Sequence, residues 1–132
     1  MPKFSSRSAK FLEECEPILQ DLFNEVVQTF DCTILCGHRG QKAQNEAYKL
    51  SLSKLQWPNS KHNRKPSQAI DVAPFVNGKV CYEKAACCYF AGYVMSIAHK
   101  YAIKLRWGGD WDSDHNIIEH TFQDLVHFEL VE

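Results

Sequence analysis

Three residues in this chain, His62, Asp71 and His127, carry side chains that commonly bind transition metals. Two imidazoles and one carboxylate form the ligand set of a catalytic zinc ion, and three protein ligands leave one coordination position open for water. Zinc lowers the pKa of this water to about 7 and polarises the carbonyl group under attack. Asp124, three residues before His127, is a candidate for the general base. The residues therefore predict a metal-dependent hydrolase.

The sequence around Asp71 and His127 strengthens this interpretation. A single histidine or aspartate is more often an ordinary surface or core residue than a metal ligand. Asp71, however, lies in the apolar run 69–73, and His127 lies in the apolar run 125–131. A carboxylate inside a buried strand is costly unless a partner or a metal neutralises it. Two polar side chains in two apolar segments indicate one shared site.

Several motifs, taken in order, resemble a known family of zinc enzymes. The motifs are Ser60-x-His62, Ala69-x-Asp71 and Asp124-x-x-His127, within the blocks 36–40, 60–62, 69–79, 105–111 and 124–130. They resemble the zinc D-Ala-D-Ala carboxypeptidase and VanY group, and especially the phage endolysins that are L-alanyl-D-glutamate peptidases. The resemblance covers most of the chain. It implies a small α+β domain of the hedgehog and D-Ala-D-Ala peptidase type, with a mainly antiparallel sheet flanked by helices.

The resemblance also implies roles for individual residues. The matched positions are His62, Asp71 and His127 as ligands of one zinc ion, Asp124 as general base, and Arg39 and Ser60 as substrate-binding residues. A planar guanidinium group and a small hydroxyl group suit the peptide or carboxylate groups of a substrate.

Two features depart from the family pattern. Six residues, 63–68, separate His62 from Ala69, where the family commonly has a shorter spacing that includes glycine. We expect a longer turn that keeps both metal ligands usable. Gln41 and Gln44 both follow Arg39, and the sequence assigns a role to neither.

The implied activity is hydrolysis of the L-alanyl-D-glutamate bond in the stem peptide of bacterial peptidoglycan, by attack of a zinc-bound water that Asp124 activates. Two alternatives stay open. A D,D-carboxypeptidase would remove a terminal D-Ala, and Arg39 would then hold the free carboxylate. A zinc-stabilised binding domain would have no catalysis, although the presence of Asp124 beside all three ligand residues argues against it.

Length and composition predict one compact domain over residues 1–132. The chain is 45% hydrophobic, and a chain of this length buries roughly two-thirds of its unfolded surface. The net charge of −1 argues against a nucleic-acid partner. We expect a monomer. The basic run 61–65 is expected to be a solvated loop, with attraction to acidic wall polymers or peptide carboxylates as the alternative.

The first residues, the longest apolar run and the cysteines indicate the cellular compartment in which the protein is found. The first residues lack the apolar core of a secretory signal, and the longest apolar run, 85–95, is too short to span a bilayer. We therefore expect a soluble protein of a cytoplasm, without stable membrane insertion. The resemblance to phage endolysins implies that this is the host cytoplasm and that the protein reaches the cell wall after release. Six cysteines without a Cys-x-x-Cys pair are expected to be reduced thiols.

Hydrophobic periodicity predicts an α+β order of elements. We expect helices at 17–30, 41–52 and 83–101, strands at 32–36, 69–73, 103–107 and 125–131, and a tight hairpin turn at Asn77-Gly78. The loop 37–40 would present Arg39.

The long loop 110–123 contains further metal-binding side chains, namely Asp112, Asp114, His115, Glu119 and His120. Its acidic residues are candidates for a calcium site, although their spacing is not that of an EF-hand and a solvated loop explains them equally well. Replacement of Asp124 or His127 by Glu119 or His120 in catalysis is a further alternative.

Three more residues are candidates for a place around the metal. Glu129 shares a face with His127 if this segment is extended, so it is expected to contact the imidazole. Trp107 and Trp111 would either wall the cleft or pack in the core.

Overall fold

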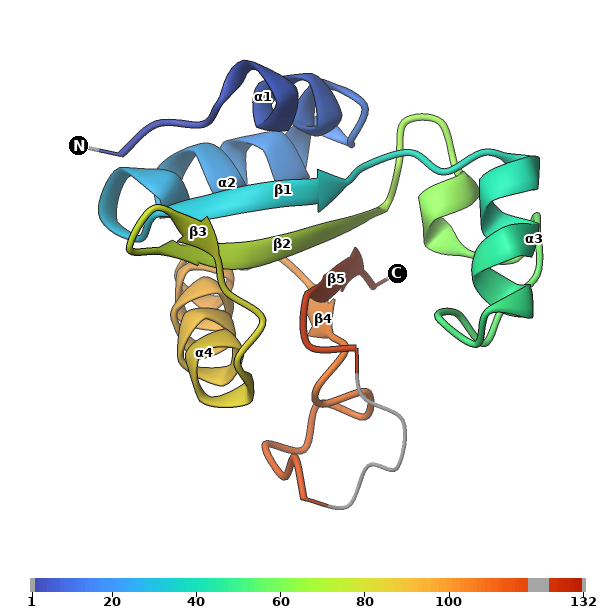
Figure 1. Cartoon of the computed structure of the whole chain (residues 1–132). Helices are drawn as coiled ribbons and strands as arrows, with labels where there is room; N and C mark the ends of the chain where they lie inside the picture. Colours follow the sequence, from blue (N-terminus) through green and yellow to red (C-terminus); the bar gives the residue numbers. More distant parts are fainter. Residues whose placement is uncertain (1, 119–123, 132) are drawn as a thin grey trace.

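A computed structural model describes residues 2–118 and 124–131. Within these residues the elements are α1 (Ser6–Glu13), α2 (Pro17–Thr29), β1 (Cys32–Cys36), α3 (Gln41–Lys49), η1 (Lys61–Asn63), β2 (Ala69–Val76), β3 (Lys79–Val80), α4 (Lys84–Lys100), β4 (Leu105–Trp107) and β5 (His127–Leu130). The strands form one antiparallel sheet of order β1-β2-β5-β4, with β3 paired to β2 (Figure 1). The predicted α+β domain is confirmed.

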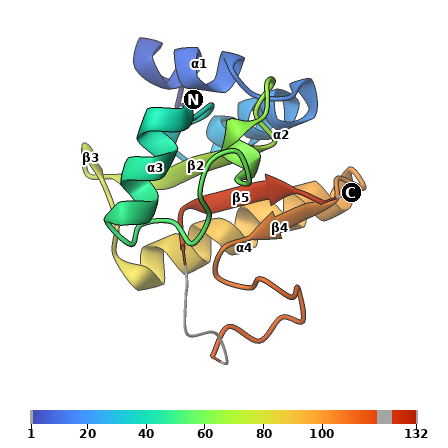
Figure 2. The same cartoon turned by 90° about the vertical axis from the view of Figure 1, so that its right-hand side faces the viewer.

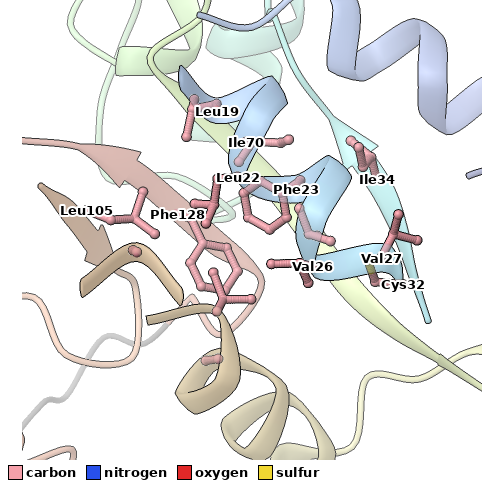
Figure 3. Close-up of a cluster of buried hydrophobic side chains, with 14 of the residues drawn as sticks. Leu19, Leu22, Phe23, Val26, Val27, Cys32, Ile34, Ile70, Leu105 and Phe128 are labelled. Atoms are coloured by element: carbon pink, nitrogen blue, oxygen red, sulfur yellow. The ribbon is translucent and has the colours of Figure 1, made fainter. Parts of the chain in front are cut away.

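Helices α2 and α4 cover one face of the sheet, and the hydrophobic core lies between them and the strands (Figures 1 and 3). Helix α2 begins with Pro17, whose fixed φ suits a first helical turn, and it buries Leu19, Leu22, Phe23, Val26 and Val27. The ring of Phe128 from β5 lies edge-on to Phe23, with 5.7 Å between ring centroids, and 6.2 Å from Phe90 of α4. Phe128 therefore joins both helices to the sheet.

Because side chains alternate along a strand, the face of the sheet opposite the core carries polar residues. Because Phe128 faces the core, its neighbours His127 and Glu129 point to the other side of β5. The register of β2 and β5 places Asp71 directly opposite His127. Asp71 and His127 thus meet on the face of the sheet opposite the core, with 3.2 Å between Asp71 Oδ1 and His127 Nδ1. Figure 2 views the molecule from the side that carries α3.

The predicted hairpin turn is confirmed. Phe75 pairs with Val80 and Val76 with Lys79, which leaves Asn77 and Gly78 as a two-residue loop. Their φ angles of 53° and 76° belong to the left-handed region that this turn requires.

Several boundaries differ from those predicted. Helix α3 ends at Lys49 rather than near residue 52, and β4 and β5 are shorter than the apolar runs that predicted them. Helix α1 was not predicted; it is short and mostly polar, and Ser8 and Leu12 are its only buried residues. Its other support is polar: Ser5 caps its first turn, and the hydroxyl of Ser8 accepts a hydrogen bond from the Ile34 amide of β1 at 3.0 Å.

All six cysteines, which fall within the described residues, are free thiols. No helix in the described part of the chain is long and apolar enough to cross a bilayer.

Candidate metal centre

The side chains of His62, Asp71 and His127 converge on one point. His62 Nε2 lies 3.1 Å from Asp71 Oδ1 and 3.2 Å from His127 Nδ1, and His127 Nδ1 lies 3.2 Å from Asp71 Oδ1. All three residues are buried. The structure thus brings together, from η1, β2 and β5, the three residues that the sequence predicted as metal ligands.

This triangle has the dimensions of a zinc site. Two ligand atoms that each lie about 2.0–2.1 Å from a tetrahedral zinc ion are separated by roughly 3.3 Å. The three observed separations of 3.1–3.2 Å are close to that value, so one ion can contact all three atoms after a small outward movement. The residues present fit a three-ligand zinc site with an open position.

A short 3-10 helix and its capping bonds orient His62. The Ser60 hydroxyl accepts a hydrogen bond from the His62 amide at 3.2 Å, and the Asn63 side chain accepts one from the Ser60 amide at 3.0 Å. His62 Nδ1 lies 2.7 Å from the carbonyl oxygen of Gly37, which fixes the proton on Nδ1 and leaves Nε2 as the ligand atom. The observed contacts of Ser60 therefore position His62, and its role toward substrate stays a prediction.

Glu129 orients the second imidazole in the same way. Glu129 Oε1 lies 2.8 Å from His127 Nε2, so the other ring nitrogen, Nδ1, faces the cluster. Burial alone would raise the pKa of Glu129, but the hydrogen bond and charge of His127, with Lys61 nearby, hold it below its usual range. The predicted contact between Glu129 and His127 is confirmed.

Replacing Glu129 by glutamine is expected to weaken zinc binding by about tenfold or more, because carboxylate partners of ligating histidines contribute at about this level. The amide keeps the shape but loses the charge that raises the basicity of His127. Competition against a zinc-binding dye would measure the change. Glu13→Gln, on the exposed side of α1, is the matched control. Equal zinc affinity in both variants would contradict this role.

The three residues also form a buried ion-pair network. Burial opposes charge on Asp71, yet His62 and the hydrogen bonds from both imidazoles hold the pKa of this carboxyl well below its usual range. Burial would likewise lower the pKa of His62, but the Asp71 carboxylate outweighs it and raises the pKa to about 10. Metal binding at this cluster is therefore expected to be coupled to the release of protons.

Arg39 lies at the edge of the cluster. Its Nη2 atom is 3.3 Å from Asp71 Oδ2, and its Nη1 atom donates to Gln44 Oε1 at 3.1 Å. The loop that follows β1 is held to η1 by the bond from the Arg39 amide to the His62 carbonyl at 2.8 Å. A guanidinium group thus lies beside the candidate metal ligands, where the predicted substrate role requires it.

Gln44 is a residue whose importance the sequence did not reveal. It is fully buried on an otherwise solvent-facing helix, and its amide makes four hydrogen bonds. The partners are Arg39 Nη1, Asn63 Nδ2, Ser53 Oγ and the carbonyl oxygen of Leu55. The available signal was indirect: helix 41–49 has no apolar stripe, so a polar residue had to anchor it.

Asp124 lies in the electric field of the cluster. Burial and the charge of Asp71 raise the pKa of Asp124, while His127, His62 and Arg39 oppose that shift. A carboxylate with a raised pKa is a stronger base than an ordinary aspartate, which suits proton transfer. Its backbone is fixed by a bond from the Asp124 amide to Gly108 at 2.9 Å and from the His127 amide to Asp124 at 3.1 Å.

Gly108→Ala is expected to displace Asp124 and to lower both stability and activity. A Cβ atom at this position would lie 2.1 Å from the Asp124 carbonyl oxygen, which is backbone and can move only with the chain. Overpacking of this kind costs about 1–3 kcal/mol. Denaturant unfolding and peptidase rates would measure both effects.

The control for this substitution is Gly92→Ala in α4, where an added Cβ meets nothing within 4 Å. Alanine there is expected to stabilise the helix by about 0.5–1 kcal/mol with unchanged activity. Similar behaviour of the two variants would contradict the steric argument.

Trp107 and Trp111 lie in different surroundings. Trp107 is buried in the core, and its indole N–H donates to the Leu125 carbonyl at 2.9 Å. The ring of Trp111 lies 5.5 Å from the ring of His127, so only Trp111 stands beside the metal cluster. Sequence reasoning had not separated these two roles.

The loop after β4 contains a second group of possible metal ligands. Carboxylate oxygens of Asp110, Asp112 and Asp114 lie within 4.8 Å of one another. Asp112 and Asp114 are exposed, and exposed acidic groups are common without an ion, so the calcium site stays a prediction. Glu119 and His120, the alternative catalytic residues, lie outside the described residues.

Comparisons with known proteins identify the family and the fold of this chain. Residues 1–131 match the family model described as "Phage L-alanyl-D-glutamate peptidase". The L-alanyl-D-glutamate peptidase of Escherichia phage T5 is 34% identical over 137 residues, which cover 98% of this chain and 98% of the relative. The crystal structure of the Serratia marcescens L-Ala D-Glu endopeptidase ChiX has a TM-score of 0.77 at 23% identity, over 98% of this chain and 90% of that one. This last likeness concerns the fold.

Proposed function

Because the chain belongs to the family of phage L-alanyl-D-glutamate peptidases, we propose that it is a zinc-dependent endolysin that cuts the L-alanyl-D-glutamate bond of peptidoglycan stem peptides. The family resemblance stated from the sequence motifs is thereby confirmed, and the chain is a peptidase. The observation that carries the metal-dependent mechanism is the convergence of His62 Nε2, Asp71 Oδ1 and His127 Nδ1 within 3.2 Å of one another.

In this mechanism His62, Asp71 and His127 hold the zinc ion. When bound, zinc supplies a Lewis acid that lowers the pKa of water and polarises the scissile carbonyl. Gly37 and Glu129 keep the two imidazoles in the tautomers that present a lone pair to the site. These supporting contacts exist in the protein before any ion arrives, which makes the site preorganised.

The chain's other residues handle the proton and the substrate. Asp124 accepts the proton of the attacking water at its carboxylate and passes it to the leaving nitrogen. Arg39 is placed to hold an oxygen of the substrate peptide, since its guanidinium group lies beside Asp71 at the rim of the cluster. Trp111 shields one side of His127 from water.

The test is mass spectrometry of the products formed from purified peptidoglycan by the zinc-loaded protein, with Asp124→Ala run in parallel. New L-alanine C-termini and D-glutamate N-termini, absent with the variant, are expected. Loss of only terminal D-Ala would replace this proposal by the D,D-carboxypeptidase, and an unchanged wall would favour the non-catalytic binding domain. The family description favours the first outcome.

We further propose that the protein acts as a monomer on the cell wall after release from the host cytoplasm. A single chain supplies all three proposed metal ligands, from η1, β2 and β5. The proposed site therefore needs no residue from a second copy. Light scattering of the purified protein would test the oligomeric state.

A further inference from the structure

Helix α3 and the segment after it expose an unusual number of large apolar side chains. Five of the eleven exposed large hydrophobic residues in the described part of the chain lie within ten positions of one another. They are Tyr48 (43% exposed), Leu50 (58%), Leu52 (68%), Leu55 (48%) and Trp57 (40%). This group, the α3 patch, stands on the side of the molecule that carries α3 in Figure 1.

The same region is strongly basic. Residues 41–65 contain six of the fifteen Lys and Arg residues of the chain but only one of its sixteen Asp and Glu residues. Five of the six cations, all except Lys61, have exposed side chains. A chain of net charge −1 thus concentrates positive charge around its exposed leucines.

The α3 patch is exposed because polar contacts hold this region in place. The only buried residue of α3 is Gln44, and its amide fixes the following segment through Ser53 and Leu55. The apolar side chains of the patch are therefore left out of the core, on a backbone that hydrogen bonds have already shaped. Large apolar side chains exposed together, on a segment that also carries exposed cations, are typical of an interaction surface.

We propose that the α3 patch docks the protein on an anionic phospholipid membrane, in a peripheral and reversible way. Leucine and tryptophan side chains enter the boundary between headgroups and acyl chains, and lysines beside them bind lipid phosphates. Leucines favour lipid over a glycan partner, because sugar rings stack on aromatic faces and the two most exposed members are Leu50 and Leu52.

Docking by this surface would place the metal centre close to the membrane. The basic segment continues into η1, which carries His62, and the backbone of His62 bonds to the Arg39 loop. This consequence rests on the proposed peptidase function. The docking itself does not, since it can be measured without any hydrolysis.

The experiment measures co-sedimentation of the full chain with vesicles of phosphatidylglycerol and phosphatidylcholine, and with vesicles of phosphatidylcholine alone. Binding to the anionic vesicles is expected, at least tenfold stronger than to the neutral ones and weakened by salt. The variant Leu50→Ser/Leu52→Ser is expected to lower the partition coefficient about tenfold, as is Lys42→Glu/Lys49→Glu.

The matched controls carry the same types of substitution on other parts of the surface. Ile18→Ser/Tyr82→Ser and Lys79→Glu/Lys84→Glu alter exposed residues outside the α3 patch and are expected to bind vesicles like the unmodified chain. Circular dichroism and cleavage of a soluble stem peptide check that all variants are folded. Failure of cleavage in the unmodified chain would affect the proposed function alone.

Three outcomes would overturn the docking proposal. Equal binding to neutral and anionic vesicles would remove the role of charge. An equal loss of vesicle binding in the patch variants and the control variants would show that the α3 patch is not the docking surface. Absence of vesicle binding, with patch-dependent binding to purified peptidoglycan instead, would assign the surface to the cell wall.

Discussion

Asp124→Asn is expected to lower kcat by about 10²–10⁴-fold while the protein keeps its zinc. Asparagine has nearly the same shape as aspartate but cannot accept the proton of the attacking water. The backbone bonds that join Asp124 to Gly108 and His127 involve only main-chain atoms, so they survive the substitution. The expected loss is therefore chemical rather than structural. Rates on a soluble stem peptide and zinc content by atomic absorption would measure it.

The matched control is Asp21→Asn, a surface aspartate on α2 that is expected to leave rate and zinc content unchanged. An Asp124→Asn enzyme with a rate within about fivefold of the unmodified protein would exclude Asp124 as the base. Glu119 and His120, which the sequence offers as alternatives, would then be the next residues to substitute. Loss of zinc in Asp124→Asn would instead indicate that this carboxylate supports the metal ligands.

The sequence was sufficient to predict that Asp71 and His127 lie together, and the physical reason is definite. Asp71 and His127 are polar residues in apolar runs, and such residues need a partner when buried. The structure supplies it by pairing them directly across β2 and β5. Glu129 followed from strand alternation alone, because residues two apart share a face. These two predictions depended on local pattern, whereas the inclusion of His62 rested on the order of motifs shared with the zinc peptidase family.

Other parts of the site depend on contacts that no local pattern reveals. Gln44 reaches partners between five and nineteen positions away, and nothing in its immediate sequence separates it from Gln41. Gly108 is required because the Asp124 backbone passes within contact distance, although the two residues stand at opposite ends of the long connection between β4 and β5. Helix α1 was missed because it is short and mostly polar: Leu12 packs in the core, and Ser8 adds a hydrogen bond to the edge strand β1 that no local pattern reveals.

Removal of zinc with a chelator is expected to abolish hydrolysis but to leave the protein folded. The core around Phe23, Phe90 and Phe128 lies on the opposite face of the sheet from the metal cluster. Among the described residues, no buried side-chain nitrogen or oxygen lacks a hydrogen-bond partner even without an ion. The imidazoles and the Asp71 carboxylate satisfy one another instead. Metal binding therefore completes a site within an existing fold.

Chelation is therefore expected to change hydrolysis and Tm but not the secondary structure. The far-UV circular dichroism spectrum is expected to be unchanged after chelation. The Tm is expected to fall, because zinc binds only the native state. Zinc at 100 times its Kd adds about 2.7 kcal/mol to the free energy of unfolding. Readdition of zinc is expected to restore both Tm and hydrolysis, and magnesium, which prefers oxygen ligands, is expected to restore neither. Unfolding on chelation would instead show that zinc binding is coupled to folding. In that case the ion pairs between His62 and Asp71 would not be sufficient to hold β2, β5 and η1 together.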